Sequence, residues 1–249
     1  MSEVSSLFGG PAPAGSAITL YAKASPDYAA KVHNTIELLK AAAAEHPGKV
    51  VQATSLGVED MIVTDLIARH GIGIAVGTLE TGKLHPEPVA LIGTIEQHYA
   101  DAFNGQGIQV EVHKPVAEVV IEFVRKNGEK AMYESIDLRK ACCGLRKLEP
   151  LARMLEGRTA WITGLRREQS NNRGGMLPRE SDDKGRAKFN PMIDWTWGDV
   201  WHYVQAFNVP YNPLHDQFMP SIGCEPCTRA IAVGEDFRAG RWWWEDEGA

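Results

Sequence analysis

The sequence predicts an α/β fold in which a mainly parallel, twisted sheet carries helices on both faces. Two observations lead to this prediction. Short runs rich in β-branched residues alternate with stretches of helical periodicity between residues 25 and 112, a pattern typical of right-handed βαβ units. The length of 249 residues and the hydrophobic share of 44% suffice for one large domain with a buried core.

Local signals place the elements in order along the chain. Residues 25–44 carry apolar side chains at helical spacing and end before Pro47-Gly48, which stops a helix. Residues 179–187 are rich in charge and glycine, so we expect a solvated loop there. Strands are expected at residues 50–54, 72–76, 108–112 and 160–163. Three further helices are expected: one begins at residue 61, a second ends at residue 99, and a third spans residues 194–206.

The chain is expected to hold one domain between two less regular ends. Residues 1–19 are predicted to be a flexible lead-in, residues 20–235 the α/β domain, and residues 236–249 the start of a mobile C-terminal tail. The N-terminus has neither a basic start nor an apolar run, so no signal peptide is expected. No stretch approaches the roughly 18 apolar residues that span a bilayer. We therefore expect a cytoplasmic protein without membrane contact.

The net charge of −6 and the pI near 5.8 produce no global field that attracts polyanions, so long nucleic acid is not expected as a partner. Any anion site must therefore be local. Basic residues do gather near three parts of the sequence. They are Arg139, Lys140, Arg146 and Lys147, then Arg166, Arg167 and Arg173, and finally Arg229, Arg238 and Arg241.

All four cysteines fall in two tight pairs, Cys142-Cys143 and Cys224-x-x-Cys227. In a reducing compartment such thiols are more often metal ligands or redox groups than structural disulfides. Two pairs can complete a four-sulfur site. Neighbouring side chains on a helix diverge by about 100°, which suits the separate corner irons of a four-iron cluster better than one small ion. We favour the cluster, with a zinc site or buried unligated thiols as the alternatives.

A possible anion loop lies between the first predicted strand and its helix, at residues 55–60. Gly57 lets the backbone approach a ligand, and the free N–H groups at a helix start favour phosphate or sulfate. The loop lacks the G-x-x-x-x-G-K-[ST] pattern of a Walker loop. Two histidines in turns, His85 and His215, are expected to form structural hydrogen bonds rather than to act in catalysis.

Taken in order, these segments resemble the assimilatory adenylyl-sulfate reductase branch of the sulfonucleotide reductases. The resemblance runs from about Val50 to Glu247. The matching segments are a modified PP-loop at residues 55–60, the segment at 79–86, the first cysteine pair with residues 144–150, the segment at 163–170, the second pair within 221–229, and the segment at 240–245.

The resemblance implies an adenine-nucleotide α-hydrolase-like (PP-loop) fold and reduction of adenosine 5′-phosphosulfate to sulfite and AMP. It implies a 4Fe-4S cluster on the four cysteines, with the nucleotide across the strand ends. The cysteine pairs favour this substrate over its 3′-phosphorylated form. The implied substrate contacts are Ser55 and Gly57 in the phosphosulfate loop, Leu79, Thr81 and Gly82 against the nucleoside, and Lys147, Arg166, Arg238 and Arg241 on the phosphosulfate.

The nucleophile is where the sequence departs from the family pattern. The family uses a cysteine in a Glu-Cys-Gly-Leu-His segment, and thioredoxin then releases sulfite from the enzyme S-sulfonate. Here the only cysteines are the four predicted ligands, so we expect the nucleophile on a tail beyond Ala249. A thiolate is needed because no other side chain could be regenerated by dithiol exchange.

The expected partners are the sulfonucleotide, thioredoxin as reductant and further copies of the chain in a homo-oligomer. Three other functions stay open. One is a cluster-carrying reductase of the 3′-phosphorylated substrate, and another is a PP-loop ATPase of the adenylylating, tRNA-thiolation type. The third is a non-catalytic iron–sulfur module that binds nucleotides. ATP hydrolysis, sulfite release and the effect of restoring the tail distinguish them.

Overall fold

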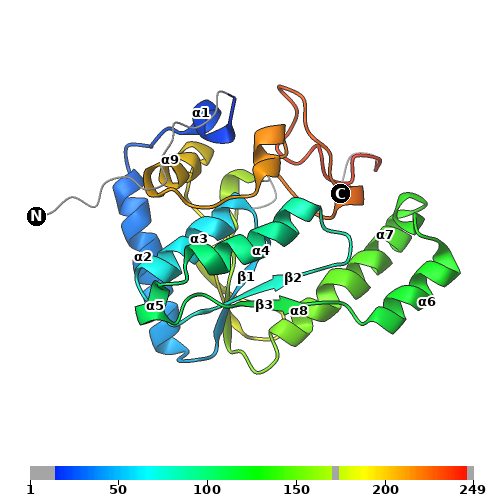
Figure 1. The fold of residues 1–249 in the computed structure, drawn as a ribbon, viewed down its shortest axis with the longest axis horizontal. Coiled ribbons are helices and arrows are strands. Elements are labelled where there is room, and N and C mark those ends of the chain that lie inside the picture. Colours follow the sequence, from blue (N-terminus) through cyan, green and yellow to red (C-terminus); the bar gives the residue numbers. More distant parts are fainter. Residues whose placement is uncertain (1–14, 170–173, 246–249) are drawn as a thin grey trace, which may run out of the picture.

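The structure, a computed structural model, describes residues 15–169 and 174–245. Its centre is a six-stranded sheet with the order β3-β2-β1-β4-β6-β5 (Figure 1). Five strands are parallel, which confirms the predicted sheet, and one edge strand is antiparallel. The strands are β1 (Val50–Thr54), β2 (Ala75–Leu79), β3 (Val110–His113), β4 (Ala160–Ile162), the antiparallel β5 (Arg179–Ser181), and β6 (Ala187–Phe189).

Helices cover both faces of the sheet, as predicted. Apolar residues of α2, α3, α4 and α9 form the main core against one face, and α8 packs with Val51 and Trp161 on the other. Helices α6 and α7 extend beyond the sheet on one side (Figure 1). The helices are α1 (Ala17–Tyr21), α2 (Tyr28–Glu45), α3 (Val58–Arg69), α4 (Pro86–His98), α5 (Ala102–Gly105), α6 (Ala117–Asn127), α7 (Ile136–Cys143), α8 (Glu149–Met154) and α9 (Trp197–Phe207).

The prediction of a solvated loop at residues 179–187 is wrong, because this segment supplies β5 and the start of β6. Asp182 accepts the turn hydrogen bond of Gly185, and Asp182 N–H donates to the carbonyl of Arg186. Gly185 has φ +78°, a conformation that glycine adopts readily. β6 then pairs with the free edge of β4. Backbone pairing with an existing edge therefore outweighs the polar composition of the segment.

The second and third strands begin later than predicted. Ile72 and Ile74 are buried, but they lie in the connection after α3, where the Ile72 N–H donates to the Ile67 carbonyl. An apolar run can fill the core without pairing as a strand, so composition alone misplaces the boundary. Helix α9 likewise starts at Trp197, after a capping box formed by Thr196 and Asp199.

A change of helical geometry joins α7 to α8. Gly144–Leu148 form a π-helical turn that continues directly into α8. Pro150 lies at the start of α8 and has no N–H to donate, which interrupts the regular hydrogen-bond pattern. Such π turns are frequent at functional sites. The turn carries Arg146 and Lys147 directly after the first cysteine pair.

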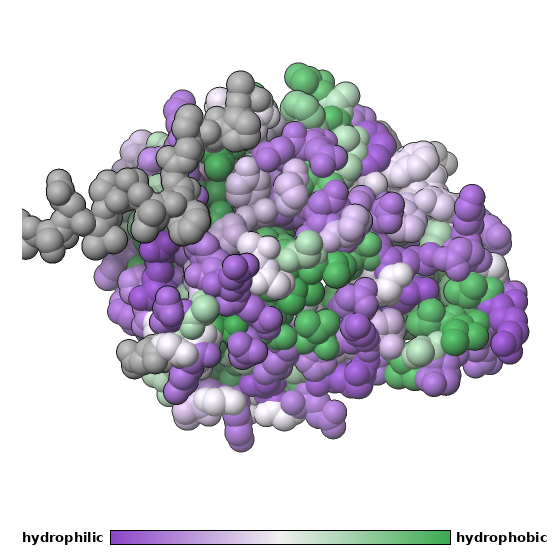
Figure 2. Space-filling view, in the orientation of Figure 1, coloured by the Kyte–Doolittle hydropathy of each residue, from purple (hydrophilic) through white to green (hydrophobic). Residues whose placement is uncertain are grey.

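Apolar side chains are exposed on and near α6. Val116, Val119 and Ile121 are each more than two-fifths exposed, and Figure 2 shows a hydrophobic group at this side of the molecule. Helix α6 has no buried residue among those described. Within the described part of the chain, no helix combines the length and the apolar character that a membrane crossing requires.

Candidate active site

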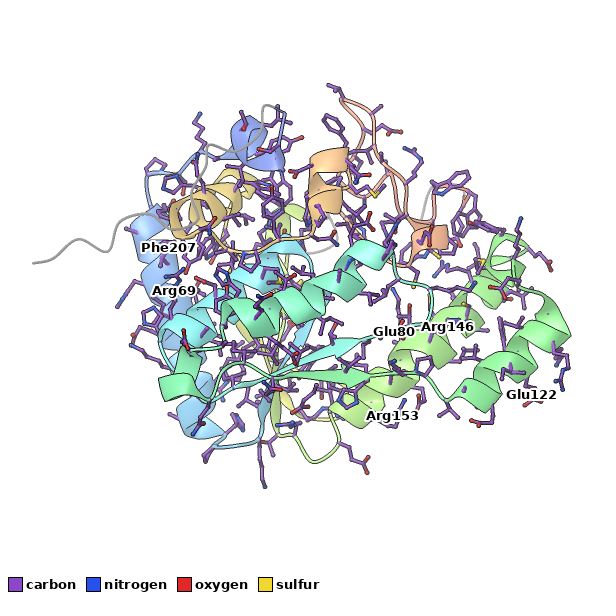
Figure 3. All side chains as sticks on the ribbon, viewed as in Figure 1. Arg69, Glu80, Glu122, Arg146, Arg153 and Phe207 are labelled. Carbon is purple, nitrogen blue, oxygen red and sulfur yellow. The ribbon has the colours of Figure 1, made fainter. Side chains whose placement is uncertain are left out.

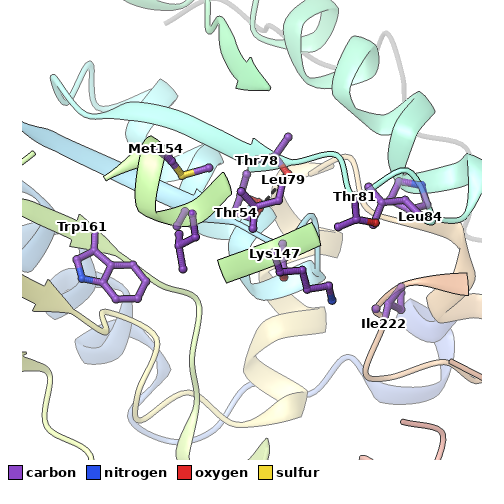
Figure 4. A pocket seen from close by; sticks show the side chains of 14 residues that line it. Thr54, Thr78, Leu79, Thr81, Leu84, Lys147, Met154, Trp161 and Ile222 are labelled. Atoms are coloured by element: carbon purple, nitrogen blue, oxygen red, sulfur yellow. Dashed lines mark hydrogen bonds between the residues drawn. The ribbon is translucent and has the colours of Figure 1, made fainter. Parts of the chain in front are cut away.

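Two adjoining cavities open at the carboxyl ends of β1, β2 and β4, where parallel sheets bind ligands. Their volumes are about 220 and about 390 Å³. They share a boundary formed by five residues, and Figure 4 shows Lys147 of this boundary lying between Trp161 and Ile222. The shared residues are Ala53, Ser55, Lys147, Trp161 and Ile222.

The first cavity is largely apolar and lies on the α8 side of the sheet. Leu79 and Thr81, two of the residues expected against the nucleoside, line it together with Met154. Gly82, the third, is not among its lining residues. Gly82 forms the turn behind it with φ +71°, and its N–H donates to Glu80 Oε1 at 2.6 Å. The cavity is therefore suited to a flat, weakly polar group such as a nucleoside base.

The loop after β1 borders the second cavity, which Ser55 and Gly57, the residues expected in the phosphosulfate loop, both line. Ser55 donates to Asp60 Oδ2 from both its backbone N–H (2.8 Å) and its Oγ (2.7 Å). Leu56 adopts a left-handed conformation with φ 61°, which is unusual for a residue with a side chain. Burial raises the pKa of Asp60 to about 6, although the hydrogen bonds from Ser55 act in the opposite direction.

The start of α3 is less open to an anion than the sequence suggests. The Val58 N–H donates to His215 Nε2 at 3.2 Å, so one of the free N–H groups already has a partner. This bond confirms the structural hydrogen bond expected for His215. Burial lowers the pKa of His215 to about 4, which keeps the ring neutral and able to accept. His215 also lines the second cavity.

Three cations face the second cavity without a carboxylate partner. Lys147, Arg238 and Arg241 all line it, and none of them forms an ion pair with the carboxylates that the structure describes. Gly223 makes room for Arg241, because a Cβ there would lie 2.5 Å from Nη2. Burial lowers the pKa of Arg241, and the neighbouring Arg238 adds to this effect. Converging unpaired cations are suited to a multivalent anion.

Arg166 occupies a different environment from these three cations. Its side chain is fully buried, and its Nε and Nη1 donate to Glu59 (2.8 Å) and Glu168 (2.9 Å). The guanidinium also lies over the Trp197 ring at 5.2 Å. Arg166 lines neither cavity, so the structure does not bring this predicted residue to the ligand space. Its charge is matched within the protein.

The two cysteine pairs meet at a third cavity beside the other two. Cys142 and Cys143 end α7, while Cys224 precedes a short 3-10 turn at Glu225–Cys227 that Cys227 ends. All four line the same cavity, and Lys147 lines it as well as the two ligand cavities. The cysteine pairs therefore meet, and Arg139, Arg146 and Lys147 converge on them, whereas Arg166, Arg167 and Arg229 pair with carboxylates instead.

Four thiols gathered at one cavity are a donor set of the kind that holds an iron–sulfur cluster. Three of the four cysteines are less than a tenth exposed, and the apolar residues Met132 and Trp242 surround them. Within the described residues, no group of three or more His, Cys, Asp or Glu side chains is arranged to hold one metal ion. Burial and the neighbouring thiols raise the pKa of Cys227 to about 11, which favours its protonated thiol at neutral pH.

The turn after β2 contacts the cysteine site directly. Thr81 Oγ1 lies 3.2 Å from Cys224 Sγ, and Arg146 Nη1 donates to the Thr81 carbonyl at 2.7 Å. Figure 3 shows Arg146 next to Glu80, which precedes this turn. The Glu225 N–H also donates to the Lys83 carbonyl at 2.8 Å. The turn after β2 and the second cysteine pair therefore form one hydrogen-bonded unit.

Sequence reasoning did not identify several residues that line the second cavity. Trp161 faces it from β4, and Lys188 on β6 lies over the Trp161 ring at 5.6 Å. Glu59 and Gln169 line it as well, and Gln169 donates to Glu59 at 2.8 Å. The alternation of buried Ala160 and Ile162 could have placed Trp161 on the ligand face of its strand.

Known proteins of similar sequence agree on one family. The phosphoadenosine phosphosulfate reductase domain matches residues 49–230. The chain is 47% identical over 222 residues to the adenosine 5′-phosphosulfate reductase of Burkholderia cepacia, across 89% of this chain and 86% of that protein. The corresponding enzyme of Allochromatium vinosum is 48% identical over 198 residues, across 79% of this chain and 75% of that protein.

Solved structures show the same relationship at the level of the fold. The phosphoadenylyl-sulfate reductase from Candida auris, solved as a phosphate complex, has a TM-score of 0.62 at 27% identity, across 77% of this chain and 88% of that chain. The FMN adenylyltransferase of Candida glabrata in complex with FAD and inorganic pyrophosphate has a TM-score of 0.54 at 12% identity, across 92% of this chain and 77% of that chain. The latter likeness concerns the fold alone.

Proposed function

The chain belongs to the phosphoadenosine phosphosulfate reductase domain family, and we propose that it reduces adenosine 5′-phosphosulfate to sulfite and AMP in sulfate assimilation. The relatives that are nearly half identical over most of the chain carry the name of this activity. The observation that carries the proposal is Lys147, which lines the apolar cavity, the cationic cavity and the cysteine site.

The two ligand cavities match the two halves of this substrate. The nucleoside would occupy the apolar cavity beside Leu79 and Thr81, and the phosphosulfate would occupy the second cavity. There Lys147, Arg238 and Arg241 would neutralise its negative charge. Such preorganised cations also stabilise the charge that develops on AMP as it leaves. The role predicted for Arg166 becomes, in this proposal, support of the loop through Glu59 rather than direct contact.

The reaction in this proposal has two thiol steps. A cysteine thiolate attacks the sulfate sulfur, a sulfur–sulfur bond forms, and the bond to the phosphate oxygen breaks with the electron pair on AMP. A thioredoxin thiolate then attacks the cysteine sulfur, which releases sulfite and forms a mixed disulfide. The second thioredoxin thiol displaces the enzyme's cysteine thiolate and closes the thioredoxin disulfide. Thioredoxin is oxidised, and the sulfur of the substrate is reduced. A cysteine beyond Ala249 would supply the first thiolate, because the four cysteines here would be ligands.

Cys142, Cys143, Cys224 and Cys227 would hold the 4Fe-4S cluster of this enzyme. When bound, the cluster would fix the two cysteine pairs together and tune the electric field beside Lys147. The hydrogen bond from Arg146 to the Thr81 carbonyl would then also fix the turn after β2 relative to the cluster. Iron and acid-labile sulfide in anaerobically purified protein, with absorbance at about 400 nm, would support this part. A colourless protein that contains zinc would contradict it.

The test of the function uses the 249-residue chain and the same chain extended by a Glu-Cys-Gly-Leu-His segment, each verified by intact mass. We expect both to bind AMP, measured by calorimetry. Only the extended chain should release AMP and sulfite from adenosine 5′-phosphosulfate with thioredoxin. Lys147→Met should weaken AMP binding by about tenfold or more, whereas Lys126→Met, an exposed change on α6, should not.

The outcomes separate the other candidate functions. If sulfite is released only from the 3′-phosphorylated nucleotide, that nucleotide is the substrate and adenosine 5′-phosphosulfate is not. Formation of AMP and pyrophosphate from ATP would indicate an adenylylating enzyme instead. An extended chain that binds AMP but never releases sulfite would favour a non-catalytic module.

A further inference from the structure

Residues 242–245 cross the cysteine site and are attached there by a buried ion pair. Glu245 accepts hydrogen bonds from Arg139 Nε at 2.8 Å and from Arg139 Nη2 at 2.7 Å. The two side chains are only 3% and 10% exposed. Paired hydrogen bonds between a guanidinium and a carboxylate fix orientation as well as distance. Arg139 lies on α7, one turn before Cys142 and Cys143.

Trp242 contacts both this ion pair and the buried thiols. Its ring is 4.5 Å from the Arg139 guanidinium, and it packs on the buried cysteines and lines their cavity. Its backbone has φ 50°, which is unfavourable for a residue with a Cβ. Surrounding contacts must therefore hold Trp242 in this conformation. The bidentate pair just after it supplies such a contact.

A second attachment secures the same segment next to the C-x-x-C turn. Trp244 packs edge-on against Tyr133 with ring centres 4.5 Å apart, and Tyr133 Oη donates to the Pro226 carbonyl at 2.7 Å. The Trp242 N–H donates to the Cys227 carbonyl at 3.3 Å. The segment is thus held to both cysteine pairs, through α7 on one side and through the turn on the other.

The same segment positions two of the cations of the second cavity. Arg238 and Arg241 lie 5.7 and 5.0 Å from the Trp242 ring. Arg241 is the residue before Trp242, so a shift of the tryptophan moves the Arg241 backbone directly. The segment that packs on the cysteine site through Trp242 is therefore continuous with the residues that bring Arg238 and Arg241 to the second cavity.

We propose that Arg139 and Glu245 are positioning residues whose ion pair keeps Trp242 over the cysteine site and Arg241 in the anion cavity. The inference rests on the proposed function for what the cover protects, a cluster sensitive to oxygen. It adds two residues outside the expected substrate contacts. Breaking the pair should open the site and loosen anion binding together.

The first test uses the full chain purified anaerobically with its iron. On exposure to air, Glu245→Gln should lose its absorbance at about 400 nm faster than the parent protein. An increase of about tenfold is expected from the loss of a charge-assisted contact. The dissociation constant for AMP should rise as well. The matched control is Glu235→Gln, which breaks a bidentate but exposed pair with Arg229, outside residues 242–245, and should change neither quantity.

A second test does not depend on iron. In the iron-free full chain, iodoacetamide should label the four cysteines faster in Glu245→Gln and Arg139→Gln than in the parent protein or in Glu235→Gln. The double exchange Arg139→Glu with Glu245→Arg should restore slow labelling. Unchanged circular dichroism and thermal midpoints confirm that each variant is folded, and Arg139→Lys replaces any variant that is not.

The results distinguish the two proposals. Equal labelling rates in the folded parent protein and Glu245→Gln would overturn the positioning role. A labelling rate that increases as much in the Glu235→Gln control as in Glu245→Gln would also overturn the positioning role. If no variant contains iron but labelling still accelerates, the proposed cluster is contradicted, whereas the positioning role of Arg139 and Glu245 is supported.

Discussion

At the scale of single residues, Asp60 links the loop after β1 to the core. Its carboxylate accepts both hydrogen bonds from Ser55, yet the side chain is almost fully buried. Burial dominates these hydrogen bonds and raises the pKa from 3.8 to about 6. The folded protein therefore binds a proton more tightly at this position than the unfolded chain does.

This difference predicts a pH dependence of stability. Between about pH 4 and pH 6 the folded state holds more protons, so the free energy of unfolding falls as pH rises, by about 3 kcal/mol in total from Asp60. Asp60→Asn should flatten this part of the curve, measured by urea unfolding across the range. Asp183→Asn, an exposed change, is the control. An unaltered slope in Asp60→Asn would contradict the assignment.

Paired and unpaired cations also differ at this scale. Arg166 is buried against Glu59 and Glu168, whereas Lys147 and Arg241 have no carboxylate partner among the described residues. A guanidinium already neutralised has less to gain from an anionic ligand than an unpaired one. Basic side chains with the same predicted contact therefore differ in whether a carboxylate already neutralises them, which the sequence does not reveal.

At the scale of elements, the end of β4 packs tightly on the start of α3. A Cβ on Gly164 would lie 2.5 Å from Asp60 Oδ1 and 2.9 Å from the Asp60 backbone nitrogen. The backbone atom cannot move without shifting the helix. The absence of a side chain at Gly164 thus allows the end of β4 and the start of α3 to lie together along the second cavity.

Gly164→Ala is therefore expected to lower the free energy of unfolding by about 1–3 kcal/mol and to weaken AMP binding. Gly93→Ala in α4 is the matched control, because no atom lies within 4 Å of the added Cβ. In a helix, alanine is favoured over glycine by about 1 kcal/mol, so the control should be slightly stabilised. Thermal unfolding and calorimetry with AMP measure both effects. A Gly164→Ala protein as stable as the parent would refute the close packing.

At the scale of the whole molecule, the cysteine site joins segments that are distant in sequence. One pair ends α7, and the other lies in a turn hydrogen-bonded to Lys83 after β2. A metal group held by all four thiols would bind only the folded chain, and binding would then add directly to stability.

Anaerobic removal of iron with a chelator should accordingly lower the free energy of unfolding by about 3 kcal/mol or more. The Cys224→Ser protein should be insensitive to the chelator, because it has lost one ligand. Denaturant titrations with and without chelator measure the difference. Identical curves for the parent protein would show that the thiols carry no stabilising metal.

The sequence by itself determined the parallel α/β arrangement, the strand–loop–helix position of Ser55 and Gly57, and the pairing of the cysteines. These properties depend on local periodicity and on residue type, which neighbouring residues suffice to reveal. The sequence also indicated that basic residues would converge if the cysteine pairs met.

Only the tertiary structure decided which groups find partners. The β4–β6 pairing, the bond from Val58 to His215, the burial of Arg166 against Glu59 and the attachment of Glu245 to Arg139 all join distant segments. Each depends on burial and on the competition among several possible partners. That competition is settled by packing of the whole chain, because an interior polar group must be paired wherever a partner lies within reach.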